Sequence, residues 1–227
     1  MTLVVLVRHA HSTANAAGIL SGRIEDIHLS TQGKKQAKKL TTRLGDLEVK
    51  SVRISPMIRC AETIEPWAAS NGSKVVIDQG INEMDYGTWS GRTLKTLSKE
   101  PLWKTIQEKP SKVTFPKGES MRAMQVRAMK SVTESAAKRG KGHVVIVSHG
   151  DVIKAIIASC LGMALDDFQR IVIDPASISI VDLSNARPRL LVMNNSSHSI
   201  NEILASKHSK RLLVGGGEGL KKVNGRK

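Results

Sequence analysis

The segment VVLVRHAHSTAN, from Val4 to Asn15, decides the fold of this chain. Its apolar beginning is typical of a strand buried on both faces of a parallel sheet. The strand ends, however, in the polar pair Arg8 and His9. A second segment, HVVIVSHG from His143 to Gly150, has the same arrangement and places His149 after its apolar run. Because ligands bind beyond the carboxyl ends of strands in open α/β sheets, two such strands side by side would bring both histidines to one pocket.

The rest of the chain alternates short β-rich runs with longer helical ones, which predicts a single α/β domain: a mainly parallel central sheet with helices on both faces. We expect further strands near residues 49–55, 74–78, 177–183 and 187–195, the last two forming a hairpin at one edge of the sheet. We expect helices near residues 30–47, 56–70, 119–139 and 151–162. Residues 83–116 indicate an excursion over the sheet. The predicted domain spans residues 1–205, and a basic, glycine-rich tail, expected to be flexible, spans 206–227.

The composition argues against several classes of protein. With 40% hydrophobic and 24% charged residues, the 227-residue chain has the composition of an ordinary globular protein. No apolar run approaches the roughly 18 residues of a membrane helix, so no membrane partner is expected. Cys60 and Cys160 are the only cysteines and no Cys/His grouping has zinc-site spacing, so a disulfide framework and a structural zinc are not expected. A reducing cytoplasm is the simplest setting.

The formal net charge of +15 raises the question of a nucleic-acid partner. Much of the excess lies in the helix-like stretch at residues 33–43 and in the C-terminal residues 207–227. Neither stretch contains interleaved aromatic residues or a known nucleic-acid motif. We therefore expect no nucleic-acid partner and a general attraction for small anionic substrates.

Four segments in a fixed order resemble the motifs of the histidine phosphatase superfamily, also called the phosphoglycerate mutase-like superfamily. The opening motif corresponds to residues 8–15, RHAHSTAN. SPMIRCAET then corresponds to the block that supplies Arg59, INEMDYGTWSG to the block that supplies Glu83, and VSHGDVIKA to the block that supplies His149. MNNSSHSI, at residues 193–200, also resembles a late family segment. The resemblance covers nearly everything except the tail, and it implies a phosphoglycerate mutase-like fold.

The resemblance implies phosphoryl transfer through a phosphohistidine intermediate. In this interpretation His9 is the nucleophile, since a neutral imidazole is competent near pH 7. Arg8, Arg59 and a protonated His149 surround the phosphate and stabilise its developing charge. Glu83 is the expected general acid and base, with Asp85 as the competing candidate. Three cationic groups could replace a magnesium ion, so neither a metal nor a cofactor is predicted.

Further residues are candidate substrate contacts. Those expected at the phosphate or next to it are Ser12, Asn15, Ser21, Gly22, Arg23 and Gly150. Arg23 is equally consistent with a solvated loop arginine, and the same holds for His11. Cys60 is interpreted as an inert buried thiol, and His198 as structural.

The sequence departs from the family pattern in two places. Ala10 stands where a glycine is usual, which adds a methyl group that we expect to be tolerated. The loop SGRIEDIHLSTQG, residues 21–33, is one residue longer than the common form and has His28 where a proline is usual. Because this loop helps to set substrate preference in relatives, the substrate is predicted less firmly than the chemistry.

The favoured prediction is a phosphomonoesterase acting on a small phosphorylated metabolite. A phosphoglycerate mutase is the alternative, although the short separation of Glu83 and His149 and the sequence SHGDVIKAI are more typical of the phosphatase branch. A non-catalytic binder of phosphorylated ligands or nucleic acid is a third hypothesis, disfavoured because every catalytic position is occupied. The identity of the substrate and the oligomeric state, a homodimer included, stay open at this stage.

Overall fold

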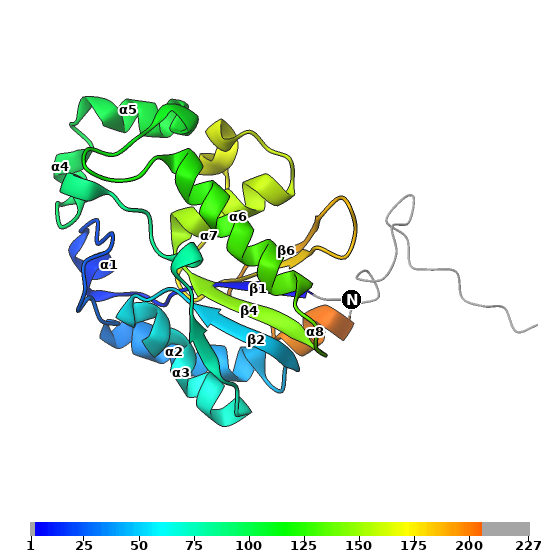
Figure 1. The fold of residues 1–227 in the computed structure, drawn as a ribbon. Helices are drawn as coiled ribbons and strands as arrows, with labels where there is room; N and C mark the ends of the chain where they lie inside the picture. The colour runs from blue at the N-terminus through cyan, green and yellow to red at the C-terminus, as the bar shows by residue number, and fades with distance from the viewer. Residues whose placement is uncertain (1–2, 206–227) are drawn as a thin grey trace, which may run out of the picture.

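Residues 3–205 are described by a computed structural model, and they contain a six-stranded sheet in the order β3-β2-β4-β1-β5-β6 (Figure 1). The strands β1 (Leu3–Arg8), β2 (Val49–Ile54), β3 (Val75–Ile77) and β4 (His143–Ser148) are parallel. β5 (Ile178–Asp182) is antiparallel to β1, and β6 (Arg189–Asn195) is antiparallel to β5. The predicted mainly parallel sheet and its edge hairpin are confirmed. The predicted tail, 206–227, lies outside the described residues.

The two strands that end in histidine are neighbours. β1 and β4 pair in parallel, with Arg8 opposite Ser148 in the register. The pairing continues one residue further, where the main-chain nitrogen of His9 donates to the main-chain oxygen of Ser148 over 2.9 Å. His9 and His149 therefore leave the sheet at the same edge, as the sequence predicted.

Helices cover both faces of the sheet (Figure 1). In β1, Val4 and Leu6 face α6 (Met121–Ala137) and α7 (Gly150–Cys160), whereas Val5 and Val7 face the opposite layer. That second layer consists of α2 (Thr31–Leu44), α3 (Ile58–Asn71) and α8 (Ile200–Ala205). Burying one leucine or valine side chain stabilises the fold by roughly 1.5–3 kcal/mol, so these two apolar layers fix the position of the strand ends.

The long helices follow local sequence signals. The side chain of Ser30 accepts from the main-chain nitrogen of Gly33 at the start of α2, and the buried Ala37, Leu40 and Leu44 recur at helical spacing. The helix predicted from Pro56 begins instead at Ile58, because Met57 still has an extended backbone. No helix among residues 3–205 is long and apolar enough to cross a membrane.

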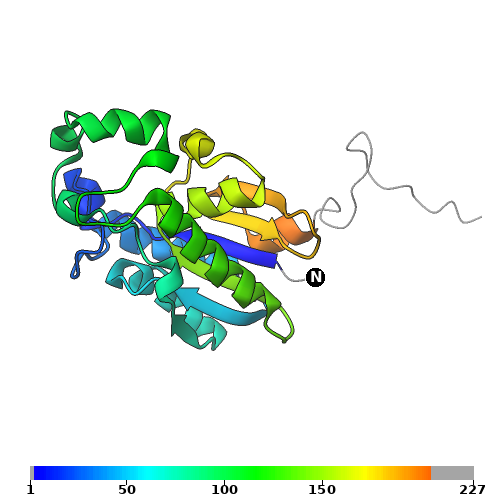
Figure 2. The same cartoon turned by 45° about the horizontal axis from the view of Figure 1, so that its top comes forward.

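The excursion at residues 83–116 contains short helices that the sequence analysis did not separate: η2 (Gly87–Trp89), α4 (Leu94–Leu97), α5 (Pro101–Glu108) and η3 (Pro110–Lys112). In Figures 1 and 2, α4 and α5 lie at the same end of the molecule as α1 (Thr13–Ala17). Aromatic contacts fasten this segment, since the ring of Phe115 lies 4.9 Å from that of Tyr86 and 5.5 Å from that of Trp89. Two other short helices, η1 (Gln79–Ile81) and η4 (Leu165–Arg170), connect longer elements.

Candidate active site

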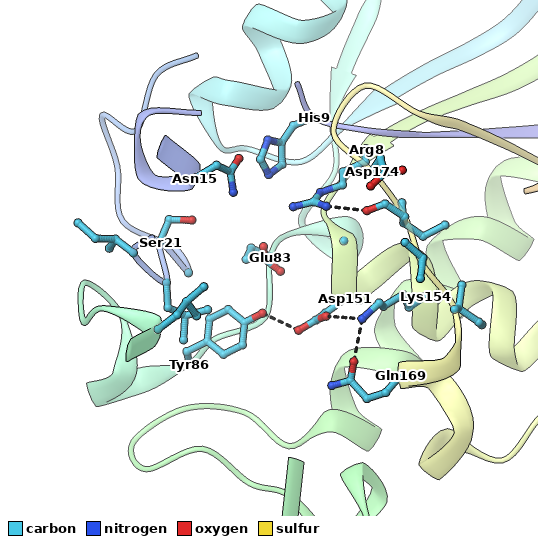
Figure 3. A pocket seen from close by; sticks show the side chains of 18 residues that line it. Arg8, His9, Asn15, Ser21, Glu83, Tyr86, Asp151, Lys154, Gln169 and Asp174 are labelled. Atoms are coloured by element: carbon cyan, nitrogen blue, oxygen red, sulfur yellow. Dashed lines mark hydrogen bonds and ion pairs between the residues drawn. The ribbon is translucent and has the colours of Figure 1, made fainter. Parts of the chain in front are cut away.

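A cavity of about 430 Å³ opens at the carboxyl edge of the sheet, and His9 points into it (Figure 3). The Nδ1 atom of His9 lies 2.8 Å from the main-chain oxygen of Ala10. Because a carbonyl oxygen only accepts, Nδ1 carries the proton and Nε2 keeps its lone pair in the neutral ring. Burial, together with the charges of Arg59 and Arg8, holds the pKa of His9 well below its usual range. His9 is therefore a neutral imidazole with an available nucleophilic nitrogen.

His149 lies next to His9, and the centroids of the two imidazole rings are 5.2 Å apart. It is fully buried and lies behind the cavity wall. Its Nε2 is 2.7 Å from the hydroxyl oxygen of Ser55, and its Nδ1 is 3.3 Å from Oε2 of Glu83. The sequence analysis expected a protonated His149. Burial and the charge of Arg59 instead lower its pKa well below the usual range, which favours the neutral ring.

Glu83 lies on the cavity wall, next to His149, with only 7% of its surface exposed. Its Oε1 accepts a hydrogen bond from the main-chain nitrogen of Met84 over 2.8 Å. Burial raises the pKa of Glu83 from 4.5 to about 7, although the Arg59 guanidinium opposes the shift. A carboxyl group with this pKa can donate a proton and later accept one near neutral pH.

The competing candidate, Asp85, has a different environment. Its Oδ1 accepts from the main-chain nitrogen of Gly87, and its Oδ2 lies 3.6 Å from Nη1 of Arg23. It is half-exposed and does not line the cavity. The geometry therefore favours Glu83 over Asp85 for proton transfer.

Two arginines supply permanent positive charge. Arg8 lines the cavity, and its Nη1 donates to the main-chain oxygen of Ile173 over 2.6 Å. Arg59 is fully buried, and its Nη2 donates to the main-chain oxygen of Gly22 over 2.8 Å. Nε and Nη1 of Arg59 have no hydrogen-bond partner among the described residues. A buried guanidinium with unsatisfied donors is costly, and an anion within reach would remove that cost.

Four of the predicted substrate contacts line the cavity: Asn15, Ser21, Gly22 and Gly150. Gly22 has a φ of +51°, and an added Cβ would lie 2.5 Å from the hydroxyl oxygen of Ser90, so glycine is required there. Gly150 is the first residue of α7, which turns the positive end of that helix toward the cavity.

Two other predicted contacts lie outside the cavity lining. Ser12 caps α1 by accepting from the main-chain nitrogen of Asn15, and its hydroxyl donates to Oδ1 of Asn15. Arg23 donates from Nε to the main-chain oxygen of Glu83 and from Nη2 to Glu119. Both side chains are committed to protein partners. The structure thus places them in support of the site, with no substrate contact evident from the geometry.

The remaining sequence candidates have ordinary surroundings. Nδ1 of His11 is 2.8 Å from the hydroxyl oxygen of Ser30. The Cys60 sulfur is buried 3.7 Å from Nε2 of His149, and burial raises the pKa of its thiol to about 12, as expected of an unreactive cysteine. His198 is exposed and contacts its neighbour Ser197.

The two residues that replace the usual family residues, Ala10 and His28, both have defined contacts. The methyl group of Ala10 is buried in a small cluster with Leu29, Ala37 and Ala176, which accounts for its tolerance next to the nucleophile. Nδ1 of His28 is 2.6 Å from a carboxylate oxygen of Glu62, so its imidazole holds the loop against α3 on the outside of the cavity.

The sequence analysis missed the wall of the cavity farthest from His9. Figure 3 shows Tyr86, Asp151, Lys154 and Gln169 together there, with Glu83 between them and His9. Asp151 and Lys154 are three residues apart on the helix that follows His149, so their common face was predictable from spacing. Gln169 comes from η4, and no sequence signal indicates its place.

The sequence analysis also missed Arg127, whose side chain holds the main chain at Glu83. Nη1 of Arg127 donates to the main-chain oxygens of Gly80 and Asn82 over 2.9 and 2.7 Å. Nη2 donates to the main-chain oxygen of Glu83 over 3.0 Å and to Oε1 of Glu119 over 2.6 Å. One guanidinium from α6 thus fixes the backbone that presents the acidic side chain.

Within residues 3–205, no group of three or more His, Cys, Asp or Glu side chains is arranged to hold a metal ion. The positive charge at this site comes instead from guanidinium groups.

Comparisons with known proteins agree with this geometry. A family model described as the histidine phosphatase superfamily (branch 1) matches residues 4–196. Phosphoserine phosphatase 1 of Hydrogenobacter thermophilus is 32% identical over 87% of this chain and 94% of its own. A 2,3-bisphosphoglycerate-dependent phosphoglycerate mutase of Thermoplasma acidophilum is 28% identical over 90% of this chain and 98% of its own. The structure of an alpha-ribazole phosphatase from Shigella flexneri, 24% identical, superposes with a TM-score of 0.78 over 88% of this chain and 99% of its own, which supports the fold.

Proposed function

This chain belongs to the histidine phosphatase superfamily and is a hydrolase of the phosphoglycerate mutase-like type; from this premise we propose that it hydrolyses a small phosphorylated metabolite through a phosphohistidine on His9, without a metal ion or cofactor. The observation that carries the proposal is the hydrogen bond between His9 and Ala10, which leaves Nε2 unprotonated in the cavity beside Glu83 and Arg8. The cavity volume of about 430 Å³ suits a metabolite-sized ester.

In the first step, Nε2 of His9 attacks the phosphorus atom and the bond to the leaving oxygen breaks. Glu83, protonated below its pKa of about 7, transfers its proton to that oxygen and becomes a carboxylate. Arg8 and Arg59 donate hydrogen bonds to the phosphoryl oxygens as charge develops on them. The product alcohol then leaves, and the phosphoryl group stays on His9.

In the second step, the Glu83 carboxylate takes a proton from a water molecule, whose oxygen attacks the phosphorus atom. The N–P bond breaks, phosphate leaves, and His9 returns to its neutral form. His149 lies behind the cavity wall with Nδ1 at Glu83 and Nε2 at Ser55, so a hydrogen bond from its ring to a phosphoryl oxygen requires one of these two contacts to open. The negative charge of a bound phosphate would raise its pKa, so protonation of His149 would accompany substrate binding.

The direct test is phosphate release from a panel of phosphomonoesters in EDTA: O-phosphoserine, 3-phosphoglycerate, glycerol 3-phosphate and p-nitrophenyl phosphate. The parent protein is compared with His9→Ala, and His198→Ala is the control for losing an exposed histidine. Release by the parent and the control, with none from His9→Ala, supports the proposal. Activity that needs an added divalent ion would contradict the metal-free mechanism.

The mutase alternative is supported by the likeness to the Thermoplasma acidophilum enzyme. The two reactions share the phosphohistidine and differ in what accepts the phosphoryl group, water or a substrate hydroxyl. Phosphoenzyme labelled with radioactive phosphate and chased with 3-phosphoglycerate separates them. Labelled inorganic phosphate is the expected product, whereas labelled bisphosphoglycerate would establish the mutase.

The remaining sequence expectations are part of the proposal. We place the protein in a reducing cytoplasm, which the unpaired, buried Cys60 and Cys160 support. The expected partner is the small substrate, with neither nucleic acid nor membrane, and a homodimer stays a prediction to be tested by light scattering.

A further inference from the structure

The wall of the cavity opposite His9 contains an ion pair on one helix face. Nζ of Lys154 lies 3.6 Å from Oδ1 of Asp151, and it donates to the side-chain oxygen of Gln169 over 2.8 Å (Figure 3). Oδ2 of Asp151 accepts from the hydroxyl of Tyr86 over 2.8 Å. All four side chains line the cavity that contains His9. We call Asp151 and Lys154 the distal pair.

Stability alone does not explain the distal pair. Its side chains are largely buried, with 29% of Asp151 and 18% of Lys154 exposed. A partly buried ion pair gains little net free energy, because desolvating the two charges offsets most of their attraction. The pair therefore points to a function in the cavity that it faces.

Both members of the pair keep hydrogen-bonding capacity for a ligand. An ammonium group has three donors; Lys154 directs one of them to Gln169 and forms an ion pair with Asp151 at 3.6 Å. A carboxylate has about four acceptor positions, and the polar partners of Asp151 are Tyr86 and Lys154. A ligand can thus place an anionic group at Lys154 and a cationic donor at Asp151 at the same time.

The two ends of the cavity differ in charge. Arg8 and Arg59 make the phosphate end strongly positive, whereas the distal pair sums to zero. A leaving group with a second anion alone would bring that anion close to the Asp151 carboxylate, and like charges at such distances cost free energy. A leaving group with both signs of charge matches the pair and leaves neither member opposed.

We propose that the distal pair recognises the leaving group, and that the preferred substrate is a phosphomonoester whose alcohol carries both an ammonium and a carboxylate. Lys154 receives the carboxylate and Asp151 the ammonium, while the phosphate lies at His9. This inference depends on the proposed phosphatase function. It specifies the substrate class, which the catalytic residues leave undefined.

The test compares kcat/KM for three esters: O-phosphoserine, with both charges; 3-phosphoglycerate, with a carboxylate only; and glycerol 3-phosphate, with neither. The parent is expected to prefer O-phosphoserine. Asp151→Asn should lower the ratio of O-phosphoserine to 3-phosphoglycerate at least tenfold. Lys154→Gln should lower the ratio of either carboxylate ester to glycerol 3-phosphate about tenfold. A ratio of kcat/KM values for two esters in the same variant isolates leaving-group recognition, because a general loss of catalysis lowers both values equally.

Matched controls are available on the surface. Asp167→Asn and Lys130→Gln make the same chemical changes at exposed ion pairs outside the cavity, and their ratios should equal those of the parent. Unchanged ratios in the two distal variants, or equal losses for all three esters, would overturn the proposal. So would a parent that prefers 3-phosphoglycerate to O-phosphoserine.

Failure of the proposed function is separable from failure of this inference. If the parent hydrolyses none of the esters, the phosphatase proposal falls. Binding of O-phosphoserine to His9→Ala, measured by calorimetry, still tests the distal pair without turnover. If adding Asp151→Asn to His9→Ala weakens the binding of O-phosphoserine about tenfold, the proposed role of the distal pair in leaving-group recognition is supported. If the binding does not change, that role is rejected.

Discussion

The two ends of the cavity were built in different ways. At the phosphate end, Arg8 and His9 follow β1 directly and His149 follows β4, so strand register alone sets their relative positions. At the distal end, Asp151 and Lys154 project from α7, and Gln169 comes from η4. Backbone pairing thus sets the two histidines and Arg8, whereas helix packing sets the distal end and also brings Arg59 from α3 to the phosphate end. This difference teaches that the sheet fixes the position of the proposed nucleophile, while the groups around it depend on the elements packed against the sheet.

The two ends of the cavity also differ in charge and burial. The phosphate end holds a carboxyl group whose pKa is raised to about 7 and a buried arginine with unsatisfied donors. The distal end holds charges that are paired with each other. We therefore expect substitutions at the phosphate end to affect every substrate, and those at the distal end to change the ranking of substrates.

The largest effect after loss of the nucleophile is expected for Glu83→Gln. Without a proton donor, kcat/KM for an alkyl phosphate should fall about 10²–10⁴-fold. In the parent, kcat/KM should decline as pH rises through about 7, where Glu83 loses the proton it must donate, and this decline should be absent in the variant.

A leaving-group comparison checks the role of Glu83. p-Nitrophenolate leaves without being protonated, so kcat/KM for p-nitrophenyl phosphate should fall far less than that for an alkyl ester. The phosphoenzyme should then accumulate, because the variant also lacks the base for the second step. Equal losses for both esters would argue against Glu83 as the general acid.

Arg59→Lys should have the next largest effect. Lysine keeps the charge but lacks the planar group that reaches both the main-chain oxygen of Gly22 and the phosphate. We expect kcat/KM to fall about 10²–10³-fold for every ester tested. Arg122→Lys, an exposed arginine outside the cavity, serves as the control. A loss confined to one ester would move Arg59 from phosphate binding to leaving-group recognition.

Glu83→Gln should also stabilise the folded protein at high pH. The folded-state pKa, about 7, exceeds the ordinary value of 4.5, so the folded state binds more protons than the unfolded state between these values. Stability therefore falls as pH rises from 4.5 through 7, and the loss is complete above 7. The glutamine variant avoids this loss, with a gain of up to about 3 kcal/mol at pH 8 and little change at pH 4.5. Urea unfolding at both values measures it, with the exposed Glu134→Gln as control.

Arg127→Lys should have the smallest of these effects. Arg127 is a positioning residue, since it holds the main-chain oxygens of Gly80, Asn82 and Glu83 and does not itself line the cavity. A lysine cannot make all these contacts, so we expect kcat to fall about tenfold with KM nearly unchanged. A purely structural role would lower the melting temperature and leave kcat per folded molecule at the parent value.

Much of the fold was predictable because its signals are local. Continuous apolar runs marked β1 and β4, and the cap at Ser30 with the spacing of Ala37 and Leu40 marked α2. The excursion at residues 83–116 was recognised, but its short helices were not. They are held by contacts such as those of Phe115 with Tyr86 and Trp89, which join residues far apart in the sequence.

The sequence by itself determined the candidate reacting groups that we propose: His9 and His149 at strand ends, with Arg8, Arg59 and Glu83 in ordered motifs. Only the tertiary structure decided their state. In the structure Arg23 and Ser12 do not line the cavity, and burial favours the neutral form of His149. Glu83 lines the cavity whereas Asp85 does not, which makes Glu83 the better candidate for proton transfer. Arg127 and the distal pair were recognised only from the structure. The physical reason is that identity and spacing are local properties of the chain. Burial, pKa and hydrogen-bond partners arise only when distant segments pack together and exclude water.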